Sequence, residues 1–181
     1  PGSSYTNTRH NIGFKIIDAI NTHFKLSKQK PKFKGLLTTG SIDEKKIYAI
    51  KPLTFMNNSG TAIKELIDYF KIDAKDVFVF HDDLDIDFGK IKAKFGGSSA
   101  GHNGIESIDK FIGKDYSRVR IGIGHPKQKK KVNNHVLEDF KEDEEEKIAE
   151  ITDNIVKQLP TLIGKKIDLF SSKVNQNLNG I

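Results

Sequence analysis

The chain has 181 residues, 36% of them hydrophobic, which is typical of one ordinary domain with a buried core. It has no cysteine, which excludes disulfides, thiolate metal sites and cysteine nucleophiles. The net charge of +6 favours an anionic partner such as nucleic acid, although on charge alone a basic protein with a solvated lysine surface is the favoured interpretation.

Helix-like and strand-like hydrophobic patterns alternate along the chain. In the first predicted helix, Ile12, Ile16 and Ile20 lie on one face. The predicted elements are a helix at 11–26, strands at 35–40 and 45–51, a helix at 57–70, strands at 77–80 and 90–95, a helix at 102–113, a strand at 118–124 and a helix from 142 to about 159. This order predicts one α/β domain over residues 1–181, with a mixed, mostly parallel β-sheet and helices on both faces.

Finer expectations concern the helices and the end of the chain. In the helix at 102–113, we expect Ile105, Ile108 and Phe111 to point inward. Pro160 is expected to stop the last helix, and residues 171–181 read as a frayed polar tail. The acidic start of that last helix, "EDEEE", suits the helix dipole rather than a binding site.

Membrane and export signals are not visible in the sequence. No apolar run approaches the ~20 residues of a membrane span, and no signal peptide can be seen. The abrupt start at Pro1 leaves room for a missing leader. We expect a cytoplasmic protein.

Four polar clusters interrupt the pattern at element junctions: "TRHNIGF", "KPLTFMNNSG", "HDDLD" and "KFGGSSAGHNG". Each has a plain structural interpretation, with His10 as a surface or capping residue, Asn58 or Ser59 as a helix cap, and the glycine-rich loop as a turn. Together they provide His, Asn and Asp but no activated nucleophile. That set suits a histidine base that activates water, an Asp that fixes its tautomer, and Asn amides that orient a carbonyl.

The aspartate cluster after the strand at 77–80 allows more than one functional interpretation. A phosphohydrolase that binds Mg²⁺ or Mn²⁺ through Asp82 and Asp83 is one alternative. Against it, these two residues would point to opposite sides if the strand continued, and Asn-rich loops are poor metal ligands. The other uses are an acid–base pair and the orientation of a base elsewhere in the chain.

The same clusters closely resemble the signature segments of the bacterial peptidyl-tRNA hydrolase family. "TRHNIGF", "KPLTFMNNSG", "HDDLDIDFGKIKAKFGGSSAGHNGIESI" and "RVRIGIGHP" occur in the family's order and spacing, and the resemblance extends through "HVLEDF" and the long final helix. It implies an esterase that cleaves the bond between a peptide and the 3′-terminal ribose of tRNA, recycling tRNA from aborted translation. We expect peptidyl-tRNA as partner, no cofactor, no metal site, no membrane and a monomer.

The resemblance also implies roles for single residues. His10 matches the catalytic base, Asp82 the acid that orients it, and Asn57 the amide that positions the scissile carbonyl and water. The residues it implies for substrate and tRNA are Tyr5 and Asn11 beside the base, Phe55 and Met56 as walls of the peptide channel, Asn103 beside water and the tRNA 3′ end, and Lys94 and Arg120 as a clamp on the tRNA phosphate. Asp83 and Asp85 are left to cap the turn through local hydrogen bonds.

Two features qualify this interpretation. Family members begin with a β-strand ending in "GLGNPG" or similar, whereas this chain starts at the "PG", so we expect the strand and its substrate-binding Asn to belong before Pro1. The glycine-rich loop reads "GGSSAG" where the family often has further glycines, which leaves Asn103 in place. A tRNA-binding module without catalysis, built on the lysine surface and this loop, is the second alternative.

Overall fold

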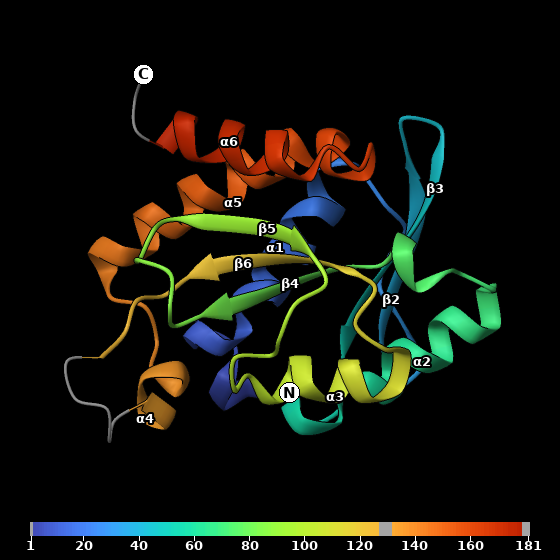
Figure 1. Cartoon of the computed structure of the whole chain (residues 1–181), viewed down its shortest axis with the longest axis horizontal. Coiled ribbons are helices and arrows are strands. Elements are labelled where there is room, and N and C mark those ends of the chain that lie inside the picture. The colour runs from blue at the N-terminus through green and yellow to red at the C-terminus, as the bar shows by residue number, and fades with distance from the viewer. Residues whose placement is uncertain (1, 127–131, 179–181) are drawn as a thin grey trace. The chain divides into compact units, whose positions relative to one another are not determined.

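The structure is a computed structural model that describes residues 2–126 and 132–178. Its backbone contacts divide this part of the chain into two compact units. Unit 1 comprises residues 20–79 and 95–117, and unit 2 comprises residues 2–19, 80–94 and 118–178. Figure 1 shows the helices and strands of both units with their labels.

The predicted elements occur in the predicted order, with differences at their ends, and β1, α4 and α6 are elements that the sequence did not predict. The α-helices are α1 (Ile12–His23), α2 (Ser59–Phe70), α3 (Asn103–Ile112), α4 (Val132–Leu137), α5 (Glu142–Ile163) and α6 (Ile167–Leu178). The strands are β1 (Lys30–Lys32), β2 (Gly35–Ile42), β3 (Lys45–Pro52), β4 (Phe78–Asp83), β5 (Ile91–Phe95) and β6 (Ser117–Gly122). In the described ranges, no helix is both long and apolar enough to span a bilayer.

Unit 1 contains a three-stranded antiparallel sheet in the order β1-β2-β3. The β2–β3 hairpin closes at the pair Ile42↔Lys45. Its two turn residues, Asp43 and Glu44, both have positive φ angles, 48° and 63°. Two consecutive left-handed residues match the right-handed twist of the strands in a two-residue hairpin. The two strands predicted at 35–40 and 45–51 are confirmed.

The core of unit 1 forms where α2 and α3 pack together. Gly60 permits this contact, because a Cβ there would collide with the carbonyl oxygen of Ser107. Ile105 and Ile108 are buried as expected, but Phe111 is 39% exposed, so its predicted inward position is wrong. Ile105, Ile108 and Phe111 are three residues apart, which is less than the 3.6 residues of a full helical turn. After two such steps from Ile105, Phe111 has rotated out of the buried face.

The second sheet has the order β4-β6-β5 and lies in unit 2, apart from a few residues at the ends of its strands. In Figure 1 the arrows of β4 and β6 point the same way and that of β5 the opposite way. The sheet is therefore mixed, and the expected mostly parallel sheet is wrong. The segment 84–90 is too short for a crossover helix, so β5 returns antiparallel to β6. Backbone hydrogen bonds at the strand ends agree with these directions. At the β4–β6 pair they join Ser117 N to Val77 O and Ile123 N to Asp83 O, and at the β6–β5 pair Gly122 N to Lys90 O and Gly96 N to Tyr116 O.

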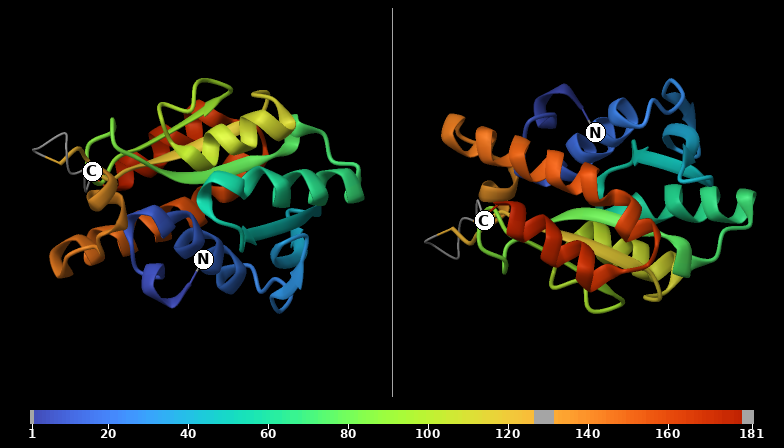
Figure 2. Two further views of the ribbon diagram at one scale, coloured as in Figure 1. Left: turned by 90° about the horizontal axis from the view of Figure 1, so that it is seen from below. Right: turned by 90° about the horizontal axis from the view of Figure 1, so that it is seen from above.

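The C-terminal helices of unit 2 correct two further expectations. α5 continues through Pro160, whose carbonyl accepts a hydrogen bond from Gly164 N at 2.9 Å. The expected tail forms α6 instead, in which Phe170, Val174 and Leu178 are buried. α6 packs beside α5, as Figure 2 shows. Phe170, Val174 and Leu178 are four residues apart, which is the spacing of an amphipathic helix. Residues 179–181 of the expected tail lie outside the described residues.

α6 also satisfies the outer edge of β5. The Asn175 side chain accepts a hydrogen bond from Ile91 N at 3.0 Å and donates one to Ile91 O at 2.9 Å. The Ser171 hydroxyl accepts one from Ala93 N at 2.8 Å. An edge strand needs such partners for its backbone groups, and here a helix side chain supplies them.

Replacing Asn175 with Ala is expected to lower the free energy of unfolding by about 1–3 kcal/mol, because the backbone groups of the buried Ile91 lose their partners. Asn177→Ala is the matched control, since that exposed residue of the same helix makes only a 3.4 Å contact with Asn154. Urea unfolding measures both. Equal losses in the two variants would contradict the role given to Asn175.

Candidate active site

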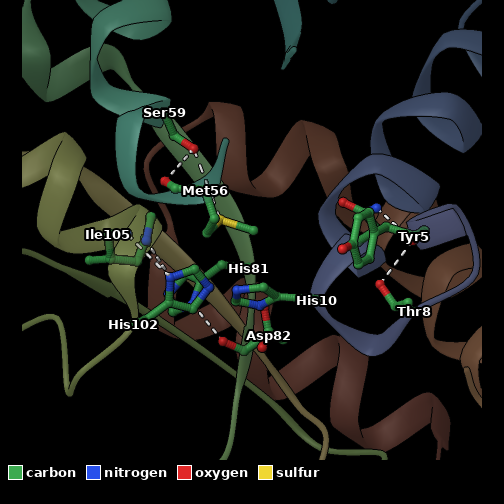
Figure 3. A network of polar contacts seen from close by, with 11 residues as sticks. Tyr5, Thr8, His10, Met56, Ser59, His81, Asp82, His102 and Ile105 are labelled. Atoms are coloured by element: carbon green, nitrogen blue, oxygen red, sulfur yellow. Dashed lines mark hydrogen bonds and ion pairs between the residues drawn. The ribbon is translucent and has the colours of Figure 1, made fainter. Parts of the chain in front are cut away.

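In unit 2, His10 lies against Asp82. His10 belongs to the short 3-10 turn Arg9–Asn11 that leads into α1, and Asp82 lies in β4. Nδ1 of His10 is 2.8 Å from Oδ1 of Asp82 (Figure 3). The Asp82 side chain is only 3% exposed and that of His10 17%. An ionised carboxylate only accepts hydrogen bonds, so this contact favours the tautomer of His10 with its proton on Nδ1.

A glycine brings these two residues together. Gly13 lies three residues after His10 in α1, and a Cβ at Gly13 would collide with the carbonyl oxygen of Phe80, two residues before Asp82. The first turn of α1 therefore rests directly on the backbone of β4. Such a close approach is one of the positions where only glycine fits.

Arg9 anchors the turn that carries His10. Its side chain is buried, with Nη1 donating to the carbonyl of Asp139 at 2.7 Å and Nη2 to the Glu144 carboxylate at 2.6 Å. Its guanidinium also lies 5.2 Å from the centre of the Phe140 ring. The sequence interpretation missed Arg9 and explained the acidic start of α5 by the helix dipole alone. A buried ion pair with an N-terminal arginine could not be inferred from either segment by itself.

β4 ends three residues later than predicted, so Asp82 and Asp83 are its last two residues instead of lying in the loop after it. Neighbouring strand residues point to opposite faces. Asp82 pairs with His10, while Oδ2 of Asp83 accepts a hydrogen bond from Arg120 Nε at 2.7 Å. Oδ1 of Asp83 accepts one from Asp85 N at 3.0 Å, which confirms the expected local hydrogen bond. The two carboxylates thus serve different partners instead of converging on one ion.

In unit 1, the loop after β3 presents two exposed candidate residues. Phe55 is 76% exposed, and Asn57 is exposed within the short turn Met56–Asn58. Ser59 fixes this turn, because its hydroxyl donates to the carbonyl of Met56 at 2.9 Å (Figure 3). Asn58 is the N-cap of α2 by position, but its side chain makes no capping hydrogen bond.

The same loop packs against the start of α3. A Cβ on Gly104 would meet the Met56 sulfur, so this glycine makes room for the methionine. Asn103, the first residue of α3, is exposed. His102 caps the helix, its Nδ1 accepting hydrogen bonds from the backbone N–H groups of Gly104 at 3.1 Å and Ile105 at 3.2 Å (Figure 3). Sequence reasoning missed this cap because it placed His102 inside the predicted helix at 102–113, whereas α3 starts one residue later.

The remaining candidates lie in unit 2. Tyr5 is 43% exposed, and its carbonyl accepts hydrogen bonds from the Thr8 hydroxyl and the Asn11 side chain (Figure 3). Asn11 is buried, so its amide holds the Tyr5 turn in place. Lys94 is half-buried in β5 and makes no ion pair with any residue in the described ranges.

The structure thus brings together His10 with Asp82 and Asp83 with Arg120 in unit 2. It brings the loop of Asn57 against the helix that starts at Asn103 in unit 1. A histidine held by a buried carboxylate on an α/β scaffold is an arrangement that many hydrolases contain. The class defined by the fold and the pair is therefore a hydrolase.

Comparison with known proteins specifies the family. The family model described as peptidyl-tRNA hydrolase matches residues 1–180. A peptidyl-tRNA hydrolase of Pelagibacter ubique is 71% identical over 97% of this chain and 94% of its own, and one of Bartonella quintana is 45% identical over 97% and 91%. A crystal structure of peptidyl-tRNA hydrolase from Acinetobacter baumannii has a TM-score of 0.90 at 32% identity, covering 97% of this chain and 90% of that one. The chain belongs to the peptidyl-tRNA hydrolase family, which confirms the resemblance.

Gly13→Ala is expected to lower the free energy of unfolding by about 1–3 kcal/mol through overpacking against Phe80, although alanine favours helices. It should also separate His10 from Asp82, which NMR detects as loss of the signal of the proton held between them. Gly60→Ala is the matched control, because it collides with Ser107 in unit 1 and should destabilise without changing that signal. An intact His10 proton signal in Gly13→Ala would contradict the role of Gly13.

Proposed function

We propose that this protein hydrolyses the ester bond between the peptide and the 3′-terminal ribose of peptidyl-tRNA, and so recycles tRNA from aborted translation. The observation that carries the proposal is the His10–Asp82 pair, which lies within the residues 1–180 that the family model matches. The relatives in Pelagibacter ubique and Bartonella quintana carry the name of this activity.

In the proposed reaction, His10 acts as the general base. Nε2 takes a proton from water as the water oxygen attacks the ester carbonyl, and the charged imidazole is stabilised by the Asp82 carboxylate at Nδ1. The tetrahedral intermediate then breaks its bond to the 3′ oxygen of the ribose, which receives the proton from Nε2. Asp82 keeps its charge throughout, because its task is to fix the tautomer and favour the imidazolium.

Asn57 and Asn103 are proposed to bind the reacting end of the substrate. Both are exposed amides on neighbouring elements of unit 1. An amide can donate to the oxygen of a carbonyl and to the negative charge that develops there. We propose this role for Asn57, and contact with water and the tRNA 3′ end for Asn103. Phe55 and Met56 are proposed to line the path of the peptide, to which an exposed apolar ring is suited.

The residues proposed for the rest of the substrate lie in unit 2. Tyr5 and Asn11 are assigned to the substrate near the base, and Lys94 and Arg120 to a phosphate of the tRNA. Lysine suits that task as a point charge and arginine as a planar fork. The net charge of +6 supports an anionic partner.

We also propose that both units form one catalytic domain that works as a monomer in the cytoplasm without metal or cofactor. The family match supports the single domain, because it runs without interruption through residues of both units. The competing metal-dependent phosphohydrolase is less well supported, since Asp82 and Asp83 turn to different partners.

Incubation with a peptidyl-tRNA and an aminoacyl-tRNA in parallel tests the proposed reaction. We expect free peptide from the first and little release from the second, because the peptide itself is part of what the site binds. Release should survive EDTA as long as the tRNA stays folded. Turnover that is lost in EDTA and restored by Mn²⁺ would favour the metal-dependent alternative, and binding of tRNA without release would favour the non-catalytic module.

His10→Ala should lower kcat by on the order of 10²- to 10⁴-fold, the usual contribution of a general base. Asp82→Asn should also lower kcat with little change in KM, because the amide no longer favours one tautomer and the imidazolium. Since the two residues act as a unit, the double variant should be little worse than His10→Ala. His23→Ala, an exposed histidine at the end of α1, is the matched control. Multiplicative losses in the double variant would remove the orienting role of Asp82.

A further inference from the structure

We propose that Asp83 is a positioning residue for tRNA, whose carboxylate holds the Arg120 guanidinium so that its terminal nitrogens present a fixed fork to a phosphate. The inference rests on the proposed function, because the phosphate is that of the tRNA substrate. It assigns to the second aspartate of "HDD" a task separate from that of the first.

The first observation is that Arg120 binds Asp83 through the Nε edge of its guanidinium. Arg120 Nε donates to Asp83 Oδ2 at 2.7 Å, and the two side chains are 19% and 6% exposed. The Arg120 side chain makes no other polar contact with a residue in the described ranges. The Nε edge is therefore occupied, while Nη1 and Nη2, the pair that grips two phosphate oxygens, is left to a ligand.

The second observation is that two further hydrogen bonds hold Asp83 itself. Its Oδ1 accepts a hydrogen bond from Asp85 N at 3.0 Å, and its backbone carbonyl accepts one from Ile123 N at 3.0 Å. It is buried at the end of β4, in the strand next to the one that carries Arg120. A guanidinium fixed in this way loses less freedom when it binds phosphate than an unrestrained one would.

Charge alone predicts the opposite effect of Asp83. A buried carboxylate beside a phosphate site repels the phosphate and offsets the charge of Arg120. If Asp83 acted only through its charge, its removal would tighten tRNA binding. If Asp83 acts by orientation, its removal weakens binding although the site becomes more positive. Whether tRNA binding tightens or weakens when Asp83 is removed therefore distinguishes an effect of its charge from an effect of orientation.

The experiment compares Asp83→Ala, Arg120→Ala and the double variant in binding of deacylated tRNA and in kcat and KM for peptidyl-tRNA. We expect Asp83→Ala to raise Kd and KM on the order of tenfold, with kcat nearly unchanged, as for loss of a charge-assisted contact. Arg120→Ala should do the same and make the salt dependence of binding shallower by about one unit. Asp83→Ala should add little in the Arg120→Ala background, because the two act as one unit.

Two further variants keep the test decisive if Asp83→Ala folds poorly. Arg120→Lys keeps the charge but has no fork and no Nε, so it should bind tRNA as weakly as Asp83→Ala. Asp85→Ala is the matched control, because it removes an exposed carboxylate from the same segment without contacting Arg120, and should not weaken binding. Tighter binding by Asp83→Ala, or wild-type binding by Arg120→Lys, would overturn the proposal.

A substrate without phosphates separates this inference from the chemistry at His10. With a peptide ester of adenosine, Asp83→Ala should keep the wild-type kcat/KM, whereas His10→Ala should lose it. A loss with this substrate would mean that Asp83 acts on Asp82 or His10, which overturns the assignment. If the wild-type protein releases no peptide from peptidyl-tRNA, the proposed function is wrong. The role of Asp83 is still tested in that case, because the binding of deacylated tRNA is measured separately.

Discussion

The close approach of α1 to β4 at Gly13 is the constraint on which the candidate site depends. The helix turn can rest on the Phe80 carbonyl only because residue 13 has no Cβ. That contact sets the distance between the turn that carries His10 and the strand that carries Asp82. The buried Arg9 then fixes the turn from its other side, through Glu144 at the start of α5. The His10–Asp82 pair is thus held by packing at Gly13 and by the buried ion pair of Arg9.

The geometry of β4 gives its last two residues, Asp82 and Asp83, different partners. Two successive aspartates in an extended strand point to opposite faces, so a two-residue sequence supplies two separate sites. Asp82 reaches the histidine, and Asp83 reaches Arg120. Neither carboxylate could take over the other's task without a shift of register by one residue, which would turn every side chain of the strand to the wrong face.

Local patterns predicted most elements but not their relations. The β2–β3 hairpin and α1 follow from nearby residues, since a two-residue turn and an amphipathic period are local properties. The mostly parallel sheet was predicted wrongly, because the direction of a strand depends on which strand it pairs with. The C-terminal segment was also misjudged, because its polar residues were taken for a solvated tail. Asn175 and Ser171 are instead the partners of the β5 edge.

The sequence by itself determined the family, the His10 and Asp82 candidates, and the loops that carry Asn57 and Asn103, because these are properties of residue type and spacing along the chain. Only the tertiary structure decided that His10 Nδ1 faces Asp82, that Arg9 is buried against α5, and that Asp83 holds Arg120. The physical reason is the same in each case. A hydrogen bond joins residues far apart in sequence only when packing brings their backbones within a few ångströms, and no local pattern records that distance.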